Sequence, residues 1–321
     1  MRILVTPTSF SANNQSRARD LLESFTGDII YNPHGRPLTD NEIIPLLEGV
    51  DGYIAGLDYI SSEVIEKAPA SLKVISRYGV GYERVDIRAA AKRGITVTST
   101  PGVNSESVAD LAFGLMLSVA RKISFFDKQV KAGEWPRATG IELYGKTIGI
   151  VGLGAIGKGI ANRANGFSMN VLAYDPFLDS TYAAANKIRA CTLDEVLGLS
   201  DIVSLHLPLN ENTRNIINTE TIAKMKKGAI IVNTARGGLI DEAAACEALR
   251  IGQLGGLGLD AFEKEPPGKS LLFAFENVVA TPHAGAHTAE AVDNMGILAV
   301  RNLIDVLSGK ECKNVISAII K

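Results

Sequence analysis

The sequence predicts an α/β protein built from two doubly wound parallel sheets. Two observations lead to this: short β-prone apolar runs alternate with helical patterns along most of the chain, and one central run leads directly into a glycine-rich loop. At 321 residues the chain is long for one domain, so about two are expected. A content of 46% hydrophobic and 21% charged residues is typical of globular proteins.

In the first hundred residues, strand-like runs and helical patterns follow each other in strict alternation. The expected strands are 3–5, 28–31, 53–55, 73–75 and 95–97. The expected helices lie near 16–25, 39–48, 61–68 and 86–93. This alternation is typical of an open parallel sheet with helices on its faces.

Beyond Pro101 and Gly102 the pattern predicts one long apolar helix from Ser105 to about Ile123, with Ser105 or Ser107 able to cap its start. A second set of alternating elements follows. Its strands are expected near 147–151, 171–174, 201–205, 229–233, 256–260 and 277–280, and its helices near 155–164, 219–226 and 241–251.

A last amphipathic helix is expected near 288–308, followed by a short tail that contains Val315 and Ile316 and packs back on the first domain. The domain boundaries are therefore placed near 100 and 285. One domain comprises 1–100 and 286–321, and 101–285 forms the other.

The glycine-rich loop has the G-x-G-x-x-G spacing of a dinucleotide-binding turn. Gly152 allows the tight turn, Gly154 lets the backbone approach a pyrophosphate, and Gly157 lets the following helix pack closely on the strand. The helix N-terminus offers free N–H groups to phosphates. Asp175 ends the next apolar run 18 residues beyond Gly157, near the spacing of an acidic ribose ligand.

A lone glycine motif is weak evidence, since glycine turns before helices also occur in purely structural βαβ units. Here the strand, helix, second strand and terminal acid all agree, so we expect dinucleotide binding. A carboxylate at Asp175 repels a 2′-phosphate, and 176–180 offers no Arg or Lys to neutralise one. The sequence therefore predicts NAD over NADP.

Three charged side chains follow expected strands of the second domain. Arg236 comes after 229–233, Glu265 after 256–260, and His283 after 277–280, at the strand ends where open α/β sheets bind ligands. They suggest an anion clamp and a carboxylate–imidazole pair. Taken singly, Arg236 also fits a surface ion pair and His283 a surface loop residue, while Glu263 competes with Glu265 as the partner of the histidine.

With these residues in place, the chain resembles the D-isomer-specific 2-hydroxyacid dehydrogenase family over essentially its whole length. The resemblance rests on VGLGAIG…AYDP, SLHLPLNENTRNIIN, NTARGGLIDEAA, GLDAFEKEPP and TPHAG. It implies a Rossmann NAD-binding domain inserted in a flavodoxin-like substrate domain. It also implies that NAD serves the interconversion of a 2-hydroxy acid and a 2-keto acid.

The resemblance further implies roles for individual residues. Arg236 binds the substrate carboxylate and carbonyl, His283 donates and accepts the proton, and Glu265 is its partner. Asp260 helps to orient the nicotinamide. The implied cofactor contacts are Gly152, Gly154, Ala155, Ile156, Gly157, Asp175, Leu207, Pro208, Thr213, Thr234, Ala235, Arg236, Asp260, His283 and Gly285. The implied substrate contacts are Arg77, Val80, Gly81, Asn104, Arg236 and His283, with Val80 and Gly81 offering backbone N–H groups.

Substrate identity stays open at this point. Arg77 matches one basic residue of the family's 3-phosphoglycerate branch, but the second, expected near 56–58, is missing. We also expect no additional C-terminal regulatory domain. Both phosphoglycerate and a smaller or differently substituted 2-hydroxy acid are compatible with these residues as the substrate. A different class of function, an NAD(H)-sensing scaffold similar to the C-terminal binding protein corepressors, is disfavoured because no extra peptide-docking segment is evident.

Net charge, the lengths of apolar runs and the cysteine content limit the kinds of binding partner that we expect. A formal charge of −2 gives no reason to expect nucleic acid or an anionic membrane, and no apolar run is long enough to span a bilayer. Three scattered cysteines without metal-ligand spacing predict a reduced cytoplasmic protein without a metal site. The apolar helix 105–123 predicts a homodimer, although packing within its own domain also explains it.

Overall fold

The computed structural model describes residues 1–10 and 16–316. The chain divides into two compact units, one of Met1–Asn104 with His287–Lys321 and one of Ser105–Ala286. These are called unit 1 and unit 2 below. The boundaries expected from the sequence, near 100 and 285, lie within a few residues of these.

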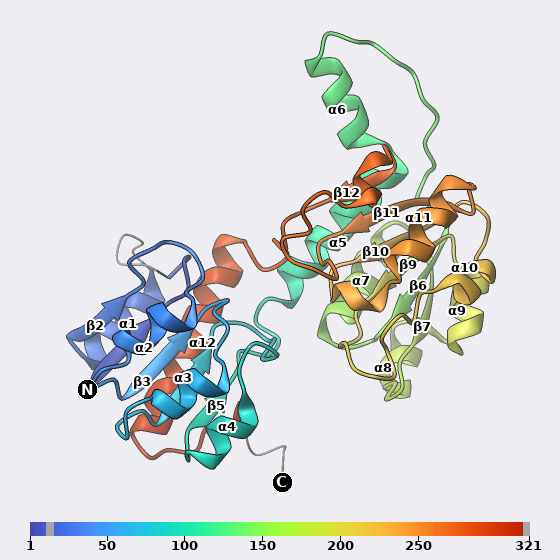
Figure 1. The fold of residues 1–321 in the computed structure, drawn as a ribbon. Helices are drawn as coiled ribbons and strands as arrows, with labels where there is room; N and C mark the ends of the chain where they lie inside the picture. The colour runs from blue at the N-terminus through green and yellow to red at the C-terminus, as the bar shows by residue number, and fades with distance from the viewer. Residues whose placement is uncertain (11–15, 317–321) are drawn as a thin grey trace. The chain divides into compact units, whose positions relative to one another are not determined.

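Unit 1 is a five-stranded parallel sheet in the order β2-β1-β3-β4-β5, which is the flavodoxin-like doubly wound order (Figure 1). Its strands are β1 (Arg2–Val5), β2 (Asp28–Tyr31), β3 (Gly52–Ala55), β4 (Val74–Arg77) and β5 (Thr96–Thr98). Its helices are α1 (Arg17–Phe25), α2 (Asp40–Leu46), α3 (Ser62–Lys67), α4 (Ile87–Lys92) and α12 (Ala289–Leu307). Every strand and helix expected here is present, with ends that differ by a residue or two.

Helices cover both faces of this sheet. Helices α1 and α12 pack together on one face, where Gly52 admits Leu303 of α12. Helices α2, α3 and α4 cover the other, with an apolar core that includes Leu4, Tyr53 and Ile75. Since all strands are parallel, their carboxyl ends and the loops that follow them share one edge.

The segment after α12 returns to this sheet, as the sequence predicted. The Ile316 N–H donates to the Val97 carbonyl at 2.8 Å, and Val315 forms an isolated antiparallel bridge with Thr98. The rest of the expected tail, 317–321, lies outside the described residues.

Unit 2 is a seven-stranded parallel sheet in the order β12-β11-β10-β9-β6-β7-β8. Its strands are β6 (Thr147–Val151), β7 (Asn170–Tyr174), β8 (Arg189–Ala190), β9 (Ile202–Leu205), β10 (Ala229–Asn233), β11 (Leu254–Leu259) and β12 (Val278–Ala280). Its helices are α5 (Ser105–Ala120), α6 (Ile123–Lys131), α7 (Ala155–Gly166), α8 (Ser180–Ala185), α9 (Leu193–Leu199), α10 (Thr219–Ala223) and α11 (Glu242–Arg250), with 3-10 turns η1 (Gly237–Leu239) and η2 (Leu271–Ala274).

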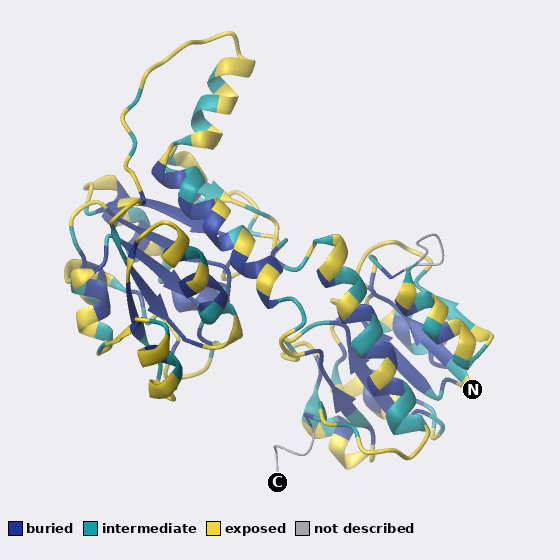
Figure 2. Cartoon of the chain, turned by 180° about the vertical axis from the view of Figure 1, so that it is seen from behind, coloured by how far each residue is buried: buried dark blue, intermediate teal, exposed yellow. Residues whose placement is uncertain are grey.

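Two apolar cores, one on each face of this sheet, bury its central strands, which Figure 2 shows in dark blue. The sequence pattern did not predict α8, β8 and α9. They have six, two and seven residues, so they are too short for a clear periodicity.

The long helix predicted from Ser105 to about Ile123 is present as α5, but the sequence did not predict the separate helix α6 that follows it. The helix ends at Ala120 and a separate helix, α6, begins at Ile123, because Lys122 adopts the left-handed conformation with φ of 54°. Nor does Ser107 cap the start of α5: its hydroxyl donates to the Gly285 carbonyl at 2.6 Å.

The apolar surface of α5 is largely covered inside unit 2. Glycines in β11 allow this close packing, since a Cβ at Gly258 would lie 2.9 Å from the Leu115 Cβ, and one at Gly256 would lie 2.5 Å from Val119. In contrast, α6 has no buried residue, and with the loop after it α6 extends away from the sheet of unit 2 (Figures 1 and 2). Exposed apolar surface is therefore a feature of α6 rather than of α5.

Across the described residues, we find no helix with the length and apolar character required to span a bilayer.

Candidate active site

A histidine–glutamate pair lies at the carboxyl edge of the unit 2 sheet. His283 follows β12 and Glu265 follows β11, two neighbouring parallel strands. The His283 Nδ1 lies 2.9 Å from Glu265 Oε1 and 3.0 Å from Oε2. Glu265 Oε1 also accepts a hydrogen bond from the Phe262 N–H at 3.2 Å, which fixes the carboxylate.

This pairing sets the protonation of the imidazole. The hydrogen bond to Glu265 raises the pKa of His283 above its usual range, against the lowering effect of burial, and the charge of Asp260 adds to the rise. Because Glu265 engages Nδ1, the nitrogen left to exchange a proton with a ligand is Nε2. The Glu265 carboxylate thus favours the protonated form of the ring and leaves Nε2 unengaged by this pair.

Asp260 holds the loop that carries His283. Its Oδ1 accepts from the Thr281 hydroxyl at 2.6 Å and from the Ala284 N–H at 2.7 Å, and its Oδ2 accepts from the Gly285 N–H at 2.8 Å. The Asp260 side chain is buried, and His283 within this loop has a left-handed backbone with φ of 54°. A non-glycine residue persists in that conformation only where its surroundings fix it, and these three hydrogen bonds do so.

Arg236 lies in the loop after β10, where both its backbone carbonyl and its guanidinium are hydrogen-bonded. Its carbonyl accepts from Asn233 Nδ2 at 2.7 Å, and its Nη1 donates to the Ala235 carbonyl at 2.8 Å. The next residue, Gly237, packs so tightly that an added Cβ would lie 1.8 Å from the Phe262 carbonyl carbon. The loops of Arg236 and Glu265 are therefore in direct backbone contact.

The charges of this cluster interact. Arg236 is close enough to His283 for its positive charge to oppose protonation of the imidazole, in the opposite sense to Glu265 and Asp260. The structure thus brings together Arg236, Glu265 and His283, which the sequence singled out from three separate segments. The competing Glu263 is exposed, and its N–H donates to Glu242 Oε1 at 3.0 Å.

The glycine loop has the geometry of a phosphate cradle. Gly152 has φ of 104°, and an added Cβ would lie 2.7 Å from the His206 backbone, while one at Gly157 would lie 2.2 Å from the Gly152 carbonyl. A Cβ added at Gly154 would meet no atom within 4 Å. Gly154 is the N-cap of α7, so no side chain caps the start of this helix. The N–H groups of Ala155 and Ile156 in the first turn of α7 are thus available to a pyrophosphate.

Asp175 stands at the end of β7, beside this cradle. Its Oδ2 accepts from the Leu153 N–H at 2.7 Å and its Oδ1 from the Phe177 N–H at 2.8 Å. A carboxylate has further lone pairs, so both oxygens can also accept from ribose hydroxyls. These residues fit a dinucleotide.

The other cofactor contacts implied by the sequence lie on neighbouring strand ends. Leu207 is buried and Pro208 exposed after β9, and the Thr213 hydroxyl donates to the Pro208 carbonyl at 2.6 Å. After β10, Ala235 is buried, and the buried hydroxyl of Thr234 has no hydrogen-bond partner within the part of the chain that the structure describes. An unpartnered buried hydroxyl at this edge is consistent with a ligand contact.

The predicted substrate contacts outside unit 2 lie in loops of unit 1. Val80 is exposed and Gly81 half-buried after β4, and Asn104 Oδ1 is buried without a partner among residues 1–10 and 16–316. Arg77 at the end of β4 is buried, with its guanidinium bound to backbone carbonyls. Its role as a substrate ligand stays a prediction.

Sequence reasoning missed how much Asp260 and Asn233 hold the site together. Both are polar residues at the ends of apolar strands, and that position was the available signal. Which loop each one binds depends on strand order in the sheet, which the motif spacing does not contain.

We predict that Asp260→Asn lowers the free energy of unfolding by about 1–3 kcal/mol, because an amide nitrogen in place of Oδ2 leaves the Gly285 N–H without an acceptor. The pKa of His283 should also fall, since one nearby negative charge is lost. Thermal unfolding and NMR titration of His283 measure both. Asp179→Asn, which changes an exposed acid of unit 2, is the control, and an unchanged His283 pKa in Asp260→Asn would contradict the assignment.

The chain is similar to known proteins over nearly its whole length. Residues 113–285 match the family model of the D-isomer specific 2-hydroxyacid dehydrogenase, NAD binding domain. The chain is 43% identical over 284 residues to D-3-phosphoglycerate dehydrogenase of Methanocaldococcus jannaschii, which covers 87% of this chain and 54% of that protein. It is 44% identical over 276 residues to hydroxypyruvate reductase of Thermotoga maritima, which covers 84% and 89%.

A crystal structure of the TT0316 protein from Thermus thermophilus superposes with a TM-score of 0.87 at 38% identity, covering 98% of this chain and all of that one. The chain spans about half the length of the archaeal phosphoglycerate dehydrogenases that it matches. The fold, the glycine cradle and these matches agree with the resemblance noted in the sequence. The chain belongs to the D-isomer specific 2-hydroxyacid dehydrogenase family, and its residues 113–285 correspond to the NAD-binding domain of that family.

Proposed function

We propose that this protein is an NAD-dependent oxidoreductase that interconverts a D-2-hydroxy acid and its 2-keto acid. The observation that carries the proposal is the bond of His283 Nδ1 to both oxygens of Glu265, next to the Arg236 loop, at the carboxyl edge of the sheet that contains the glycine cradle. In this proposal unit 2 binds NAD and unit 1 is the substrate domain.

Each residue of the cluster has a part that its chemistry permits. When bound, NAD(H) supplies or accepts the hydride. Protonated His283 donates from Nε2 to the carbonyl oxygen as negative charge develops there, and neutral His283 takes the proton back in the oxidation. Glu265 orients the ring and favours its charged form, and Arg236 binds the substrate carboxylate with its planar two-pronged group.

The cofactor and the substrate are held by separate groups. The first turn of α7 receives the pyrophosphate and Asp175 the ribose hydroxyls, with the remaining contacts as the resemblance implies. Asp260, through the 281–285 loop, keeps His283 in position. For the substrate carboxylate we propose the N–H groups of Val80 and Gly81.

The substrate belongs to the small 2-hydroxy and 2-keto acids. Matched relatives bear the names D-3-phosphoglycerate dehydrogenase, hydroxypyruvate reductase and glyoxylate reductase, so phosphorylated and unphosphorylated acids both occur among them. These names favour an enzyme over the NAD(H)-sensing corepressor-like scaffold.

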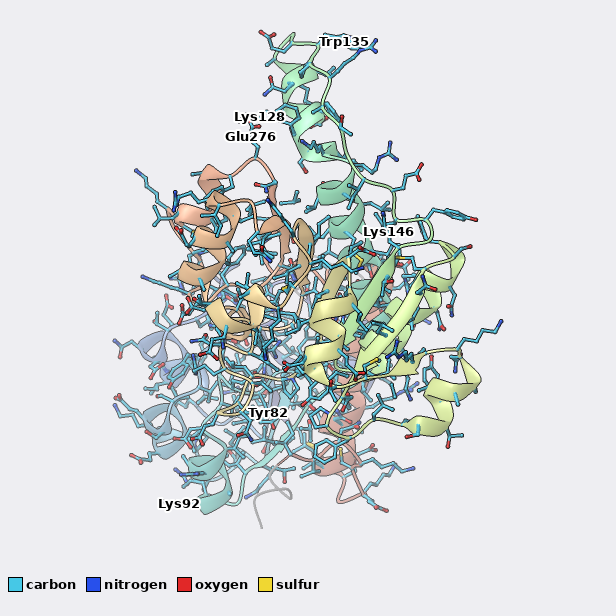
Figure 3. All side chains as sticks on the ribbon, turned by 90° about the vertical axis from the view of Figure 1, so that its right-hand side faces the viewer. Tyr82, Lys92, Lys128, Trp135, Lys146 and Glu276 are labelled. Atoms are coloured by element: carbon cyan, nitrogen blue, oxygen red, sulfur yellow. The ribbon has the colours of Figure 1, made fainter. Side chains whose placement is uncertain are left out.

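We further propose that the protein is a homodimer joined through α6 and the loop after it. Large apolar side chains are exposed there, at 51% for Ile123, 51% for Val130 and 80% for Trp135. In Figure 3, Trp135 lies at the outer end of this segment and Lys128 on α6. A second copy would cover the same surface on both chains. A cytoplasmic location completes the proposal, because three unpaired cysteines suit a reducing compartment.

The proton-transfer role predicts opposite pH preferences for the two directions. Reduction needs imidazolium and should fall as pH rises through the pKa of His283, whereas oxidation needs neutral imidazole and should rise. Glu265 raises that pKa, so Glu265→Gln should move the fall in reduction to lower pH. The measurement is a set of pH–rate profiles in both directions with NAD(H) and a panel of 2-keto and 2-hydroxy acids.

Glu263→Gln is the matched control and should leave the profile unchanged. His283→Ala should lose most activity in both directions and still bind NADH, since the pyrophosphate cradle is on another loop. Coincident profiles for wild type and Glu265→Gln would refute the pairing, and no turnover with any acid would refute the activity.

For the cofactor, we predict that kcat/KM with NADH exceeds that with NADPH by at least about tenfold. A 2′-phosphate near the Asp175 carboxylate costs ~1–4 kcal/mol at about 4 Å, depending on solvent exposure. Asp175→Asn removes the charge and should narrow the ratio, while Asp179→Asn, the next acid along the chain, should not. Equal efficiency of the two cofactors in the wild type would contradict the role of Asp175.

For the assembly, light scattering at micromolar protein should give the mass of two chains. Replacing Ile123 and Val130 together by Asp should shift the mass toward one chain, because it places charges in the proposed contact. Ile251→Asp, at an equally exposed apolar residue away from α6, is the control. A monomeric wild type would rule out the dimer.

A further inference from the structure

Two loops of unit 1 lie side by side at the carboxyl edge of its sheet. They follow β3 and β4, and backbone hydrogen bonds join them: the Ile60 N–H donates to the Arg84 carbonyl at 2.7 Å, and the Asp86 N–H donates to the Ile60 carbonyl at 3.0 Å. Arg84 Nη1 also reaches the Leu57 carbonyl at 3.3 Å. Gly81, proposed above to bind the substrate carboxylate, is in the second of these loops.

Arg77, the basic residue that the sequence associated with a phosphate, supports these loops from inside the unit. Its Nη1 donates to the Ala55 carbonyl at 2.7 Å and its Nε to the Gly81 carbonyl at 3.0 Å. The side chain is only 4% exposed, and burial lowers the pKa of its guanidinium. Arg77 therefore connects the end of β3 to the second loop rather than presenting a cation at the surface.

The segment 56–58, where the resemblance to the 3-phosphoglycerate branch implied a second basic residue, instead contains a buried carboxylate. Asp58 is fully buried and accepts from the Leu38 N–H at 2.7 Å, the Tyr53 hydroxyl at 3.1 Å and the Gly56 N–H at 3.2 Å, as well as from the Thr6 hydroxyl. It is near enough to Arg77 to interact with its charge. The positive charge of Arg77 is thus already balanced inside the unit.

Four large apolar side chains are exposed on the outer surface of the two loops. Leu57 is 52% exposed and Tyr82 is 41% exposed, with Tyr59 and Val80 also exposed beside them. The exposed charges in the second loop, Glu83 and Arg84, are of opposite sign. A phosphomonoester carries a charge of about −1.5 to −2 at pH 7 and is bound in proteins by Arg and Lys. This surface offers no excess of positive charge for it.

We propose that the substrate of this protein is an unphosphorylated 2-keto or 2-hydroxy acid with an uncharged side chain, which contacts the exposed Leu57 and Tyr82. The proposal rests on the dehydrogenase function proposed above and selects one substrate class within it. Arg77 is a positioning residue of the Gly81 loop in this view.

The test compares two acids that differ only in the phosphate: hydroxypyruvate and 3-phosphohydroxypyruvate. With NADH, the wild type should reduce hydroxypyruvate with at least about tenfold higher kcat/KM. Leu57→Arg places a cation on the proposed contact surface and should reduce that preference by about tenfold, because it favours only the phosphorylated acid. Ile251→Arg, which adds the same charge at an exposed apolar residue of unit 2 after α11, should leave the preference unchanged.

A higher kcat/KM for 3-phosphohydroxypyruvate than for hydroxypyruvate in the wild type would overturn the inference. If Arg84→Gln then abolished this preference for the phosphorylated acid, Arg84 would be identified as the phosphate ligand. A binding measurement tests the substrate class independently of the proposed activity. Calorimetry compares the binding of D-glycerate and of 3-phospho-D-glycerate to the protein in the presence of NADH. Tighter binding of the phosphorylated acid would overturn the substrate class even without turnover. Absence of turnover with every keto acid, together with preferential D-glycerate binding, would refute the activity and support the class.

Discussion

The hydrogen bonds from the 281–285 loop to the Asp260 carboxylate are the interaction on which the candidate site depends. Asp260 directly follows β11 and the loop follows β12, so these bonds connect two neighbouring strand ends. They hold His283 in a left-handed backbone conformation that is costly for a non-glycine residue. Without them, Glu265 would have no fixed imidazole to orient.

Close backbone contacts complete the same arrangement. Gly237 has no Cβ, and this allows the Arg236 loop to lie against the backbone of Phe262 in the loop that carries Glu265. Glycines in β11 likewise let α5 pack directly on the sheet. The relative positions of Arg236 and Glu265 thus depend on a glycine that lets their two loops approach closely. Two of the three loops of the site thus contact each other through their backbones, and the Asp260 carboxylate holds the third.

In unit 1 the balance of buried charge has the same importance. Arg77 and Asp58 are both buried inside the unit and their opposite charges interact. Each side chain also forms hydrogen bonds with backbone groups near the carboxyl edge of the sheet. The loops are held from inside by charged side chains, while their outer surface carries exposed apolar side chains and two charges of opposite sign. A charged residue in a motif can therefore either bind a ligand or stabilise the loops around it. Only the burial of its side chain and its hydrogen-bond partners distinguish these two roles.

The sequence by itself determined the two parallel sheets and the glycine cradle with Asp175, because each depends on periodicity or on fixed spacing along one segment. The choice of Arg236, Glu265 and His283 among the charged residues at strand ends came from the resemblance to the family. The sequence did not determine the break at Lys122, since a single left-handed residue leaves the apolar pattern intact on both sides. The tertiary structure alone decided that Asp260 holds the His283 loop, that α5 is covered while α6 is exposed, and that Arg77 is buried. These depend on which strands are neighbours and on how closely backbones approach, and residues far apart in the chain set both.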